Sequence, residues 1–382
     1  MRVNQRLYEG LIFFLSLLNS FKIVLYGNRV FESISLVISL VILSFLFFAS
    51  NLINIQNCIL TVLCVIASLS ITVLFNGGIG AAVNYLIIMF SSMLFSSYGI
   101  SKNKIRFMFA VNGFILLLFL FLLKIEEHGT SYTFKTILSR DINPNTVGII
   151  SLLTFFFLFY VGINMEKKLL KIGYLLIVFA VFLHFFIISE CRSIFIALTL
   201  FCFLYTFKRT IWKEVSVRKT IFISQIISVL FVIFYIFLYR IGATFKIDIF
   251  GKSFFSGRQI VWSSAFKAFF KNPFFGSGNS VYLESVQNTV TASAHNTMMS
   301  ILYEFGLIPT VCFYLFFGKK YDKKTIYQTC RFNQSVIIST LTITFFESFY
   351  MESYFGFLFM LFYIIEFVDI KDRKHQKIRE CS

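Results

Sequence analysis

The chain has 382 residues, of which 58% are hydrophobic and only 14% are charged, and its mean hydropathy is +0.81. Because this small number of polar groups cannot cover the surface of a water-soluble globule, the composition predicts an integral membrane protein. The net charge of +17 does not indicate a nucleic-acid partner, because the basic residues lie in short clusters between apolar runs. The seven cysteines have no Cys-x-x-Cys or metal-ligand spacing, so we expect no metal site and no cofactor.

Apolar runs of membrane-spanning length recur along the whole chain. Only helices and closed barrels satisfy their own backbone in lipid, and runs of about 20 residues fit helices. The sequence therefore predicts an all-α, polytopic membrane protein of about twelve spans, forming one integral membrane domain over residues 1–382. The predicted spans are 7–26, 30–50, 52–75, 79–98, 105–123, 146–164, 172–189, 193–207, 220–239, 297–317, 334–350 and 354–369.

The distribution of lysine and arginine predicts the orientation of these spans. If the N-terminus is cytoplasmic, 23 of the 35 basic residues lie inside and 11 outside, with Lys22 within the first span. Cytoplasmic loops retain positive charge, so this count predicts that both termini are cytoplasmic. It also places the long loop 240–296 outside the membrane.

The long outer loop contains the densest group of polar residues. Asn272-Pro273 ends a predicted helix near 257–271, because the residue before proline avoids helical geometry. Arg258 and Trp262 share one face of that helix, which we expect to lie at the lipid headgroups. A Gly-Ser-Gly turn follows at 276–278.

His295 and Asn296 then open the tenth predicted span, which puts an imidazole at the mouth of the helical bundle. Such a histidine is either a general base or a structural residue. Glu304 follows nine residues later, on roughly the opposite helical face, so we expect no direct contact with His295. An ionisable group at that depth needs a partner from another span.

Several outer arginines are candidates for binding phosphate. A guanidinium suits bidentate contact with diphosphate, and Arg258, Arg192 and Arg240 all lie on the predicted outer side. The alternative is contact with bilayer phosphates or, for Arg192, with the nearby Glu190. Glu347, at the last outer turn, is a candidate for binding the acceptor or for pairing with these arginines. The segment 140–145, Arg-Asp-Ile-Asn-Pro-Asn, is a weaker candidate of the same kind.

Together these motifs are similar to one family. Arg192-Ser193, Ser-Gly-Arg258 with Trp262, Asn-Pro273, Gly276-x-Gly278, His295-Asn296 and Glu304-x-Gly306 resemble the O-antigen polymerase and ligase family, which includes the Wzy-type repeat-unit polymerases. The resemblance covers about residues 192–306 and is only architectural elsewhere.

The resemblance implies a GT-C-like, metal-independent glycosyltransferase that uses undecaprenyl-pyrophosphate-linked oligosaccharides at the outer face of the cytoplasmic membrane. Arg192 and Arg258 would hold the leaving pyrophosphate, and His295 would accept the proton of the attacking hydroxyl. The remaining candidate substrate-binding residues are Trp262, Asn296, Glu304, Glu347 and Arg240. A chain-length regulator is a candidate partner.

Three functions fit these features. The leading one is a polymerase that joins lipid-linked repeat units into capsular, exopolysaccharide or O-antigen chains. A ligase that transfers finished glycan shares the family pattern. A transporter or flippase of the same pathway has a similar number of spans, but its polar residues more often interrupt helices at the midplane. Here they gather at the outer ends of the spans, which favours an enzyme.

Overall fold

The computed structural model describes most of the helical bundle and part of the loop 240–296. The described residues are 5–49, 63, 65–67, 69–70, 74, 79–95, 100–128, 131–211, 217–241, 248–249, 252–253, 258–278, 283–284, 290–291, 294–311, 331–347 and 354–362. Most of the predicted span 52–75, and the later parts of the spans predicted at 297–317, 334–350 and 354–369, lie outside these residues.

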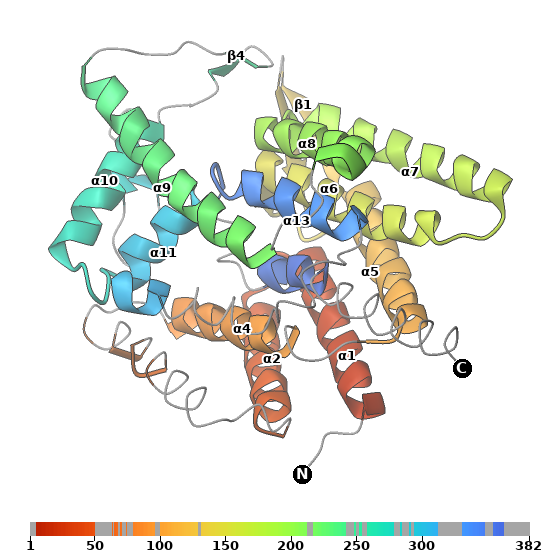
Figure 1. Cartoon of the computed structure of the whole chain (residues 1–382), viewed down its shortest axis with the longest axis horizontal. Helices are drawn as coiled ribbons and strands as arrows, with labels where there is room; N and C mark the ends of the chain where they lie inside the picture. The colour runs from red at the N-terminus through yellow and green to blue at the C-terminus, as the bar shows by residue number, and fades with distance from the viewer. Residues whose placement is uncertain are drawn as a thin grey trace.

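Helices dominate the described chain, as Figure 1 shows. They are α1 (Gln5–Val24), α2 (Arg29–Ala49), α4 (Ile79–Phe95), α5 (Lys102–Leu122), α6 (Pro144–Ile163), α7 (Lys168–Ser189), α8 (Arg192–Ile211), α9 (Val217–Arg240), α10 (Arg258–Lys271), α11 (Thr297–Phe305) and α13 (Arg331–Ile343). Two further helical segments cover 307–311 and 354–362. Six helices in the described part are long and apolar enough to cross a membrane, namely α1, α2, α5, α6, α7 and α9. The molecule is therefore a multi-pass, mainly helical membrane protein.

Short antiparallel strands interrupt the loops, which the all-α expectation did not include. β1 (Lys124–His128), β2 (Ser131–Lys135) and β3 (Asp141–Ile142) form a three-stranded sheet between α5 and α6. Glu126 on β1 binds Lys124 and Lys135, each at 2.8 Å, and these ammonium groups lower the pKa of Glu126 to about 2. The Glu126–Lys135 pair joins β1 to β2 and therefore helps to hold the hairpin together. Two two-stranded sheets lie in the loop between α9 and α11: β4 (Asp248–Ile249) with β5 (Lys252–Ser253), and β6 (Leu283–Glu284) with β7 (Val290–Thr291).

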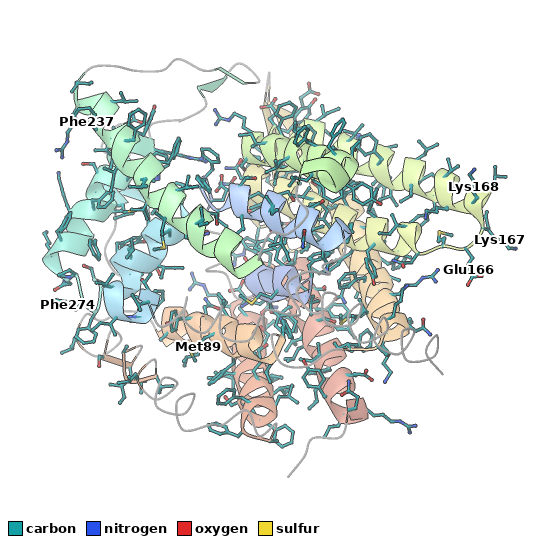
Figure 2. The ribbon with its side chains drawn as sticks, viewed as in Figure 1. Met89, Glu166, Lys167, Lys168, Phe237 and Phe274 are labelled. Atoms are coloured by element: carbon teal, nitrogen blue, oxygen red, sulfur yellow. The ribbon has the colours of Figure 1, made fainter. Side chains whose placement is uncertain are left out.

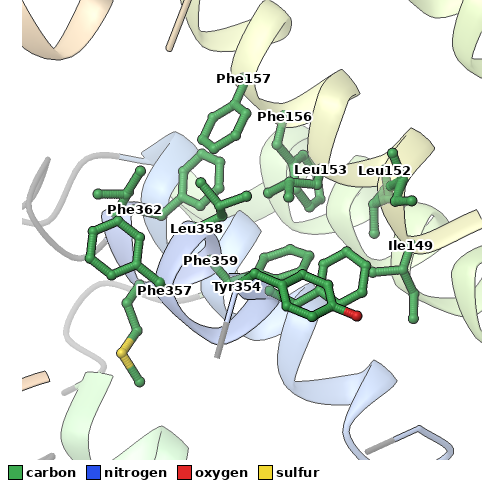
Figure 3. Close-up of a cluster of buried hydrophobic side chains, with 14 of the residues drawn as sticks. Ile149, Leu152, Leu153, Phe156, Phe157, Tyr354, Phe357, Leu358, Phe359 and Phe362 are labelled. Atoms are coloured by element: carbon green, nitrogen blue, oxygen red, sulfur yellow. The ribbon is translucent and has the colours of Figure 1, made fainter. Parts of the chain in front are cut away.

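Helix α6 lies at the centre of the bundle and packs against α5, α7 and α8. It is hydrophobic on every side, which is typical of a helix enclosed by other helices. Figure 3 shows Phe156 and Phe157 of α6 among the side chains of the segment 354–362. The Phe157 and Phe362 rings stack with centroids 5.2 Å apart. This aromatic core fixes the second half of α6 relative to the segment 354–362.

The periphery of the bundle carries large exposed apolar side chains. Figure 2 shows Phe237 and Phe274 at the edge of the molecule, and their side chains are 57% and 60% exposed. Exposed apolar area on this scale is unusual for a soluble protein and suits contact with lipid tails. Lys167 and Lys168 mark the turn between α6 and α7 at another edge of the molecule.

The structure divides one predicted span and contains the predicted loop helix. The span predicted at 297–317 is not one continuous helix, because α11 ends at Phe305 and Gly306 takes a φ of +78°. The predicted helix near 257–271 is α10, which ends before Asn272-Pro273 as expected. Ser256, which precedes the predicted helix, lies outside the described residues. Val261, Trp262 and Ala265 of α10 are buried among side chains of α9 and α11, so this face of the helix packs on protein.

Candidate functional site

Glu347 is the centre of a group of polar side chains that come from distant parts of the sequence. Its Oε1 accepts hydrogen bonds from Arg258 Nη2 at 2.9 Å and from Asn145 Nδ2 at 3.0 Å. Its Oε2 lies 3.5 Å from His295 Nδ1. Arg258 opens α10, Asn145 lies in the first turn of α6, and Glu347 follows α13. We call these four residues the Glu347 cluster.

The Arg258–Glu347 ion pair is largely removed from solvent. The exposed fractions of the two side chains are 11% and 9%, whereas 32% of the His295 side chain is exposed. Separating a pair this buried would leave a charge without its partner in a poorly solvated place, which is costly. The two side chains are therefore expected to stay together. The imidazole is the more accessible member of the cluster.

His295 is held in an uncommon backbone conformation. Its φ is +48°, in the left-handed region that costs a non-glycine residue on the order of 1–2 kcal/mol. Trp262 stabilises the residue before it: the fully buried indole donates a hydrogen bond from Nε1 to the Ala294 carbonyl oxygen at 2.9 Å. Trp262 therefore fixes the segment that presents His295, and its buried ring offers no surface for a substrate in this conformation.

Asn296 holds three parts of the chain together beside His295. Its Oδ1 accepts from the Met299 amide at 2.9 Å, which caps α11, and its Nδ2 donates to Ser228 Oγ at 2.8 Å and to the Phe345 carbonyl at 2.9 Å. The side chain is fully buried. All of these bonds are internal, so the structure gives Asn296 a positioning role between α9, α11 and the segment after α13.

Thr297 ties Glu347 to the same helix end. Its Oγ1 donates to the Glu347 carbonyl oxygen at 2.8 Å, and its amide donates to the Thr344 carbonyl at 2.9 Å. The first residues of α11 thus hold both the histidine and the backbone of the glutamate. This double attachment explains how Glu347, 52 positions after His295 in the numbering, comes to lie beside it.

Arg192 approaches the cluster through the turn between α7 and α8. Glu190 ends α7 with a φ of +48°, and Cys191 is fully buried with Sγ 3.9 Å from the Asn145 carbonyl oxygen. A Cβ at Gly148 would come within 2.6 Å of Cys191 Cβ, so this glycine lets α6 and the turn approach closely. Arg192, the next residue, interacts electrostatically with both Arg258 and Glu347.

The glycine motifs of the loop join α10 to α11 by backbone contacts. The amides of Ser277 and Gly278 donate to the carbonyls of Tyr303 and Glu304 at 2.7 and 3.0 Å. A Cβ at Gly276 would overlap the backbone of Glu304, and one at Gly306 would overlap the backbone nitrogen of Gly276. Both glycines also have positive φ. The Gly-x-Gly and Glu-x-Gly motifs therefore form one backbone junction at the base of the loop.

Glu304 and Arg240 do not join the Glu347 cluster through the bonds described above. Glu304 is buried in the last turn of α11, beside Tyr303, with which its side chain forms a hydrogen bond. Arg240 is the exposed last residue of α9, twelve residues beyond Ser228, or about 18 Å along the helix axis. Their roles as substrate-binding residues stay predictions.

Together with Arg192, the Glu347 cluster combines a base, an orienting acid and two guanidinium cations. If Nδ1 of His295 donates to Glu347, its Nε2 is left with a lone pair directed elsewhere, which is the tautomer that a general base requires. Glu347 neutralises one guanidinium, so Arg192 and Arg258 together leave one excess positive charge. This suits an anionic leaving group. Within the described residues no group of three or more His, Cys, Asp or Glu side chains could hold a metal ion.

Sequence reasoning missed several supporting residues. Asn145 was only part of the weaker segment 140–145, and Ser228, Thr297 and Cys191 were not considered as part of a site. The available signal was polarity in an apolar context: Gln225 and Ser228 are buried polar residues inside α9. Their facing partners could not be assigned without the packing of α9 against α11 and α13.

Comparison with protein families gives one match. Residues 177–314 match the family model described as Wzy_C: O-Antigen ligase. This range includes Arg192, Arg258 and His295, whereas Asn145 and Glu347 lie outside it. Neither the curated proteins nor the solved structures give a match.

Proposed function

We propose that this membrane protein is a repeat-unit polymerase, and the match of residues 177–314 to the family model described as Wzy_C: O-Antigen ligase supports the proposal. It joins undecaprenyl-pyrophosphate-linked oligosaccharides into capsular, exopolysaccharide or O-antigen chains. The observation that carries the proposal is the Glu347 cluster, in which an oriented histidine lies beside a buried arginine and near a second one.

In the proposed reaction a sugar hydroxyl of the acceptor attacks the anomeric carbon of the donor. The new glycosidic C–O bond forms as the bond from that carbon to the pyrophosphate oxygen breaks. His295 Nε2 takes the hydroxyl proton, and Glu347 stabilises the resulting imidazolium through Nδ1–H. Arg258 and Arg192 stabilise the charge that develops on the leaving pyrophosphate.

Glu347 has two tasks in this scheme. It orients His295. It also accepts a hydrogen bond from Arg258 Nη2 at 2.9 Å, which fixes the orientation of the planar guanidinium group. Arg258 also lies over the Phe346 ring, 5.7 Å from its centroid. In this scheme Glu347 acts as a positioning residue, which corresponds to the predicted alternative that it pairs with the arginines.

The ligase is the second candidate, because the matched family model carries that description. A ligase would use the same leaving group and base but would transfer the finished glycan to a different acceptor. The cytoplasmic membrane as location, both termini inside, a GT-C-like arrangement with about twelve spans, and a chain-length regulator as partner remain parts of the proposal.

Incubation of the purified protein with defined lipid-linked repeat units tests the proposal. A ladder of products on a gel supports the polymerase, and transfer only to a different acceptor supports the ligase. Redistribution of substrate across the bilayer without new glycosidic bonds supports a transporter and overturns the enzyme.

Two substitutions connect the activity to the cluster. His295→Ala removes the base, and Arg258→Lys keeps the charge but loses the bidentate fork, so each should reduce elongation at least about 100-fold. Lys168→Met, at the exposed first residue of α7, is the matched control and should elongate normally. Normal ladders from both site variants would show that the assigned mechanism is wrong.

A further inference from the structure

The turn between β2 and β3 presents two large aliphatic side chains that remain exposed. Ile137 and Leu138 are 53% and 43% exposed. The Thr136 amide donates to the Arg140 carbonyl oxygen at 2.8 Å, and the Arg140 amide donates to Thr136 Oγ1 at 3.2 Å. Ser139 reverses the chain with a φ of +56°. Thr136, which is buried, therefore closes a hydrogen-bonded loop that holds the two aliphatic side chains outward.

The pairing of the strands places this turn at the end of α5. β1 begins at Lys124, two residues after α5 ends at Leu122, and Lys124 pairs with Lys135, the last residue of β2. The turn that follows Lys135 therefore lies at the end of the sheet where α5 arrives. The last residues of that span, Phe121 and Leu122, are 61% and 49% exposed and suit contact with lipid tails.

Arg140 places the other end of the turn beside the connection from α1 to α2. A Cβ at Gly27 would lie 2.7 Å from Arg140 Cγ, so the two residues are in contact. The exposed apolar face of α2 begins at Val30, which is 69% exposed. Three residues span at most about 11 Å, and the headgroup layer adds about 5–8 Å to each side of the hydrocarbon core. Both neighbouring connections therefore place the turn where the lipid-facing surface ends.

The turn lies on the same side of the membrane as the Glu347 cluster. β3 is followed by α6, whose Asn145 donates to Glu347 Oε1 at 3.0 Å. From Arg140 to Asn145 the chain spans at most about 17 Å, which is less than the roughly 30 Å of a hydrocarbon core. The position of the turn therefore bears on the start of α6 and, through Asn145, on the cluster.

We propose that Ile137 and Leu138 anchor the β2–β3 turn in the lipid leaflet on the side of the Glu347 cluster. Aliphatic side chains leave water when they enter the boundary between headgroups and acyl chains. Arg140, exposed beside them, carries the charge that lipid phosphates attract. Lipid already faces the neighbouring spans, so it is the occupant that the position of the turn favours. The anchor holds the start of α6 at headgroup depth, and its test needs no sugar substrate.

Quenching by brominated lipid tests the anchor in the full-length protein. Ile137→Trp and Leu138→Trp are each measured in nanodiscs of phosphatidylcholine with and without brominated acyl chains, after subtraction of the signal of the parent protein, which has two tryptophans. Glu127→Trp is the matched control, because Glu127 is exposed and lies about 10 Å farther along β1 than Lys124. We expect the brominated chains to quench the two turn variants at least about twice as strongly as the control.

A second readout uses a smaller side chain, because tryptophan itself prefers the membrane interface. Leu138→Cys should react with a water-soluble maleimide at least about tenfold more slowly than Thr133→Cys in the same nanodiscs, since apolar surroundings disfavour the reactive thiolate. Thr133 is exposed on β2. Labelling is again measured relative to the parent protein.

Three outcomes would overturn the inference. Quenching no stronger than in Glu127→Trp, with rapid labelling of Leu138→Cys, would show that the turn faces water. Slow labelling without quenching would show that protein, such as a second copy of the chain, covers the turn. Strong quenching with rapid labelling would show that the introduced tryptophan drew the turn into the bilayer.

Discussion

Individual residues divide into those that can meet a substrate and those that hold them in place. His295 is partly exposed, whereas Asn296 and Trp262 are fully buried and use their polar atoms on internal hydrogen bonds. Residues adjacent in the sequence thus have different tasks. Glu347 joins the two groups, because its carboxylate contacts both His295 and Arg258.

Glu347→Gln should lower the turnover number about 100-fold while the protein stays inserted. The amide keeps the shape but loses the charge that favours the imidazolium and pairs with Arg258. The turnover number is measured with saturating lipid-linked repeat units. Glu126→Gln, in the hairpin, is the control and should elongate at the wild-type rate. Wild-type turnover by Glu347→Gln would remove Glu347 from the mechanism.

Asn296→Ala should mainly lower the stability of the protein, whereas His295→Ala should mainly lower its activity. Asn296→Ala loses a helix cap and two buried hydrogen bonds, so we expect a loss of about 2–4 kcal/mol in the free energy of unfolding. His295→Ala keeps that network and should lose less than about 1 kcal/mol, yet abolish elongation. Unfolding in detergent micelles measures the first quantity. A more destabilising His295→Ala would indicate that the histidine is structural.

At the scale of elements, the break after α11 positions the site. Gly306 has φ +78° and ψ −174°, a conformation that is essentially confined to glycine. The amides of Leu307 and Ile308 then donate to the carbonyls of Pro273 and Phe274, at 2.8 and 3.1 Å, instead of continuing α11. The loop helix α10 is thereby attached to the end of α11, and its first residue, Arg258, reaches Glu347.

Gly306→Ala should destabilise the protein by at least about 1–3 kcal/mol, because a Cβ overlaps the backbone of Gly276 and the backbone conformation is strained. Gly173→Ala is the matched control: nothing lies within 4 Å of a Cβ there, and alanine in α7 should stabilise by about 0.5–1 kcal/mol. Thermal unfolding of both variants in micelles measures the difference. Equal stabilities would contradict the backbone junction.

At the scale of the whole molecule, the site collects one end of several helices. The first turns of α6, α8 and α10 meet the residues just before α11 and just after α13. The count of basic residues predicts that all five positions are on the same side of the membrane. The predicted topology requires these five positions to lie on one side of the membrane, and their convergence agrees with it. Which side of the membrane that is remains a separate prediction.

Cysteine labelling in intact cells checks which side that is. Thr133→Cys, exposed on β2, should react with a membrane-impermeant maleimide in intact cells. Lys168→Cys, at the exposed start of α7, should react only after permeabilisation. Labelling is measured relative to the parent protein, which contains its native cysteines. The reverse pattern would invert the orientation and place the site in the cytoplasm.

The sequence by itself determined the membrane class, the position of most helices, and the loop that carries Arg258 and His295, because hydrophobicity and basic clusters are local properties of the chain. It also separated Glu304 from His295 by helical periodicity. Only the tertiary structure decided that Glu347 and Asn145 join His295 and Arg258, that Trp262 and Asn296 are internal supports, and that α11 breaks at Gly306. Those facts depend on which helices pack together and where two backbones touch, and neither is written in local composition.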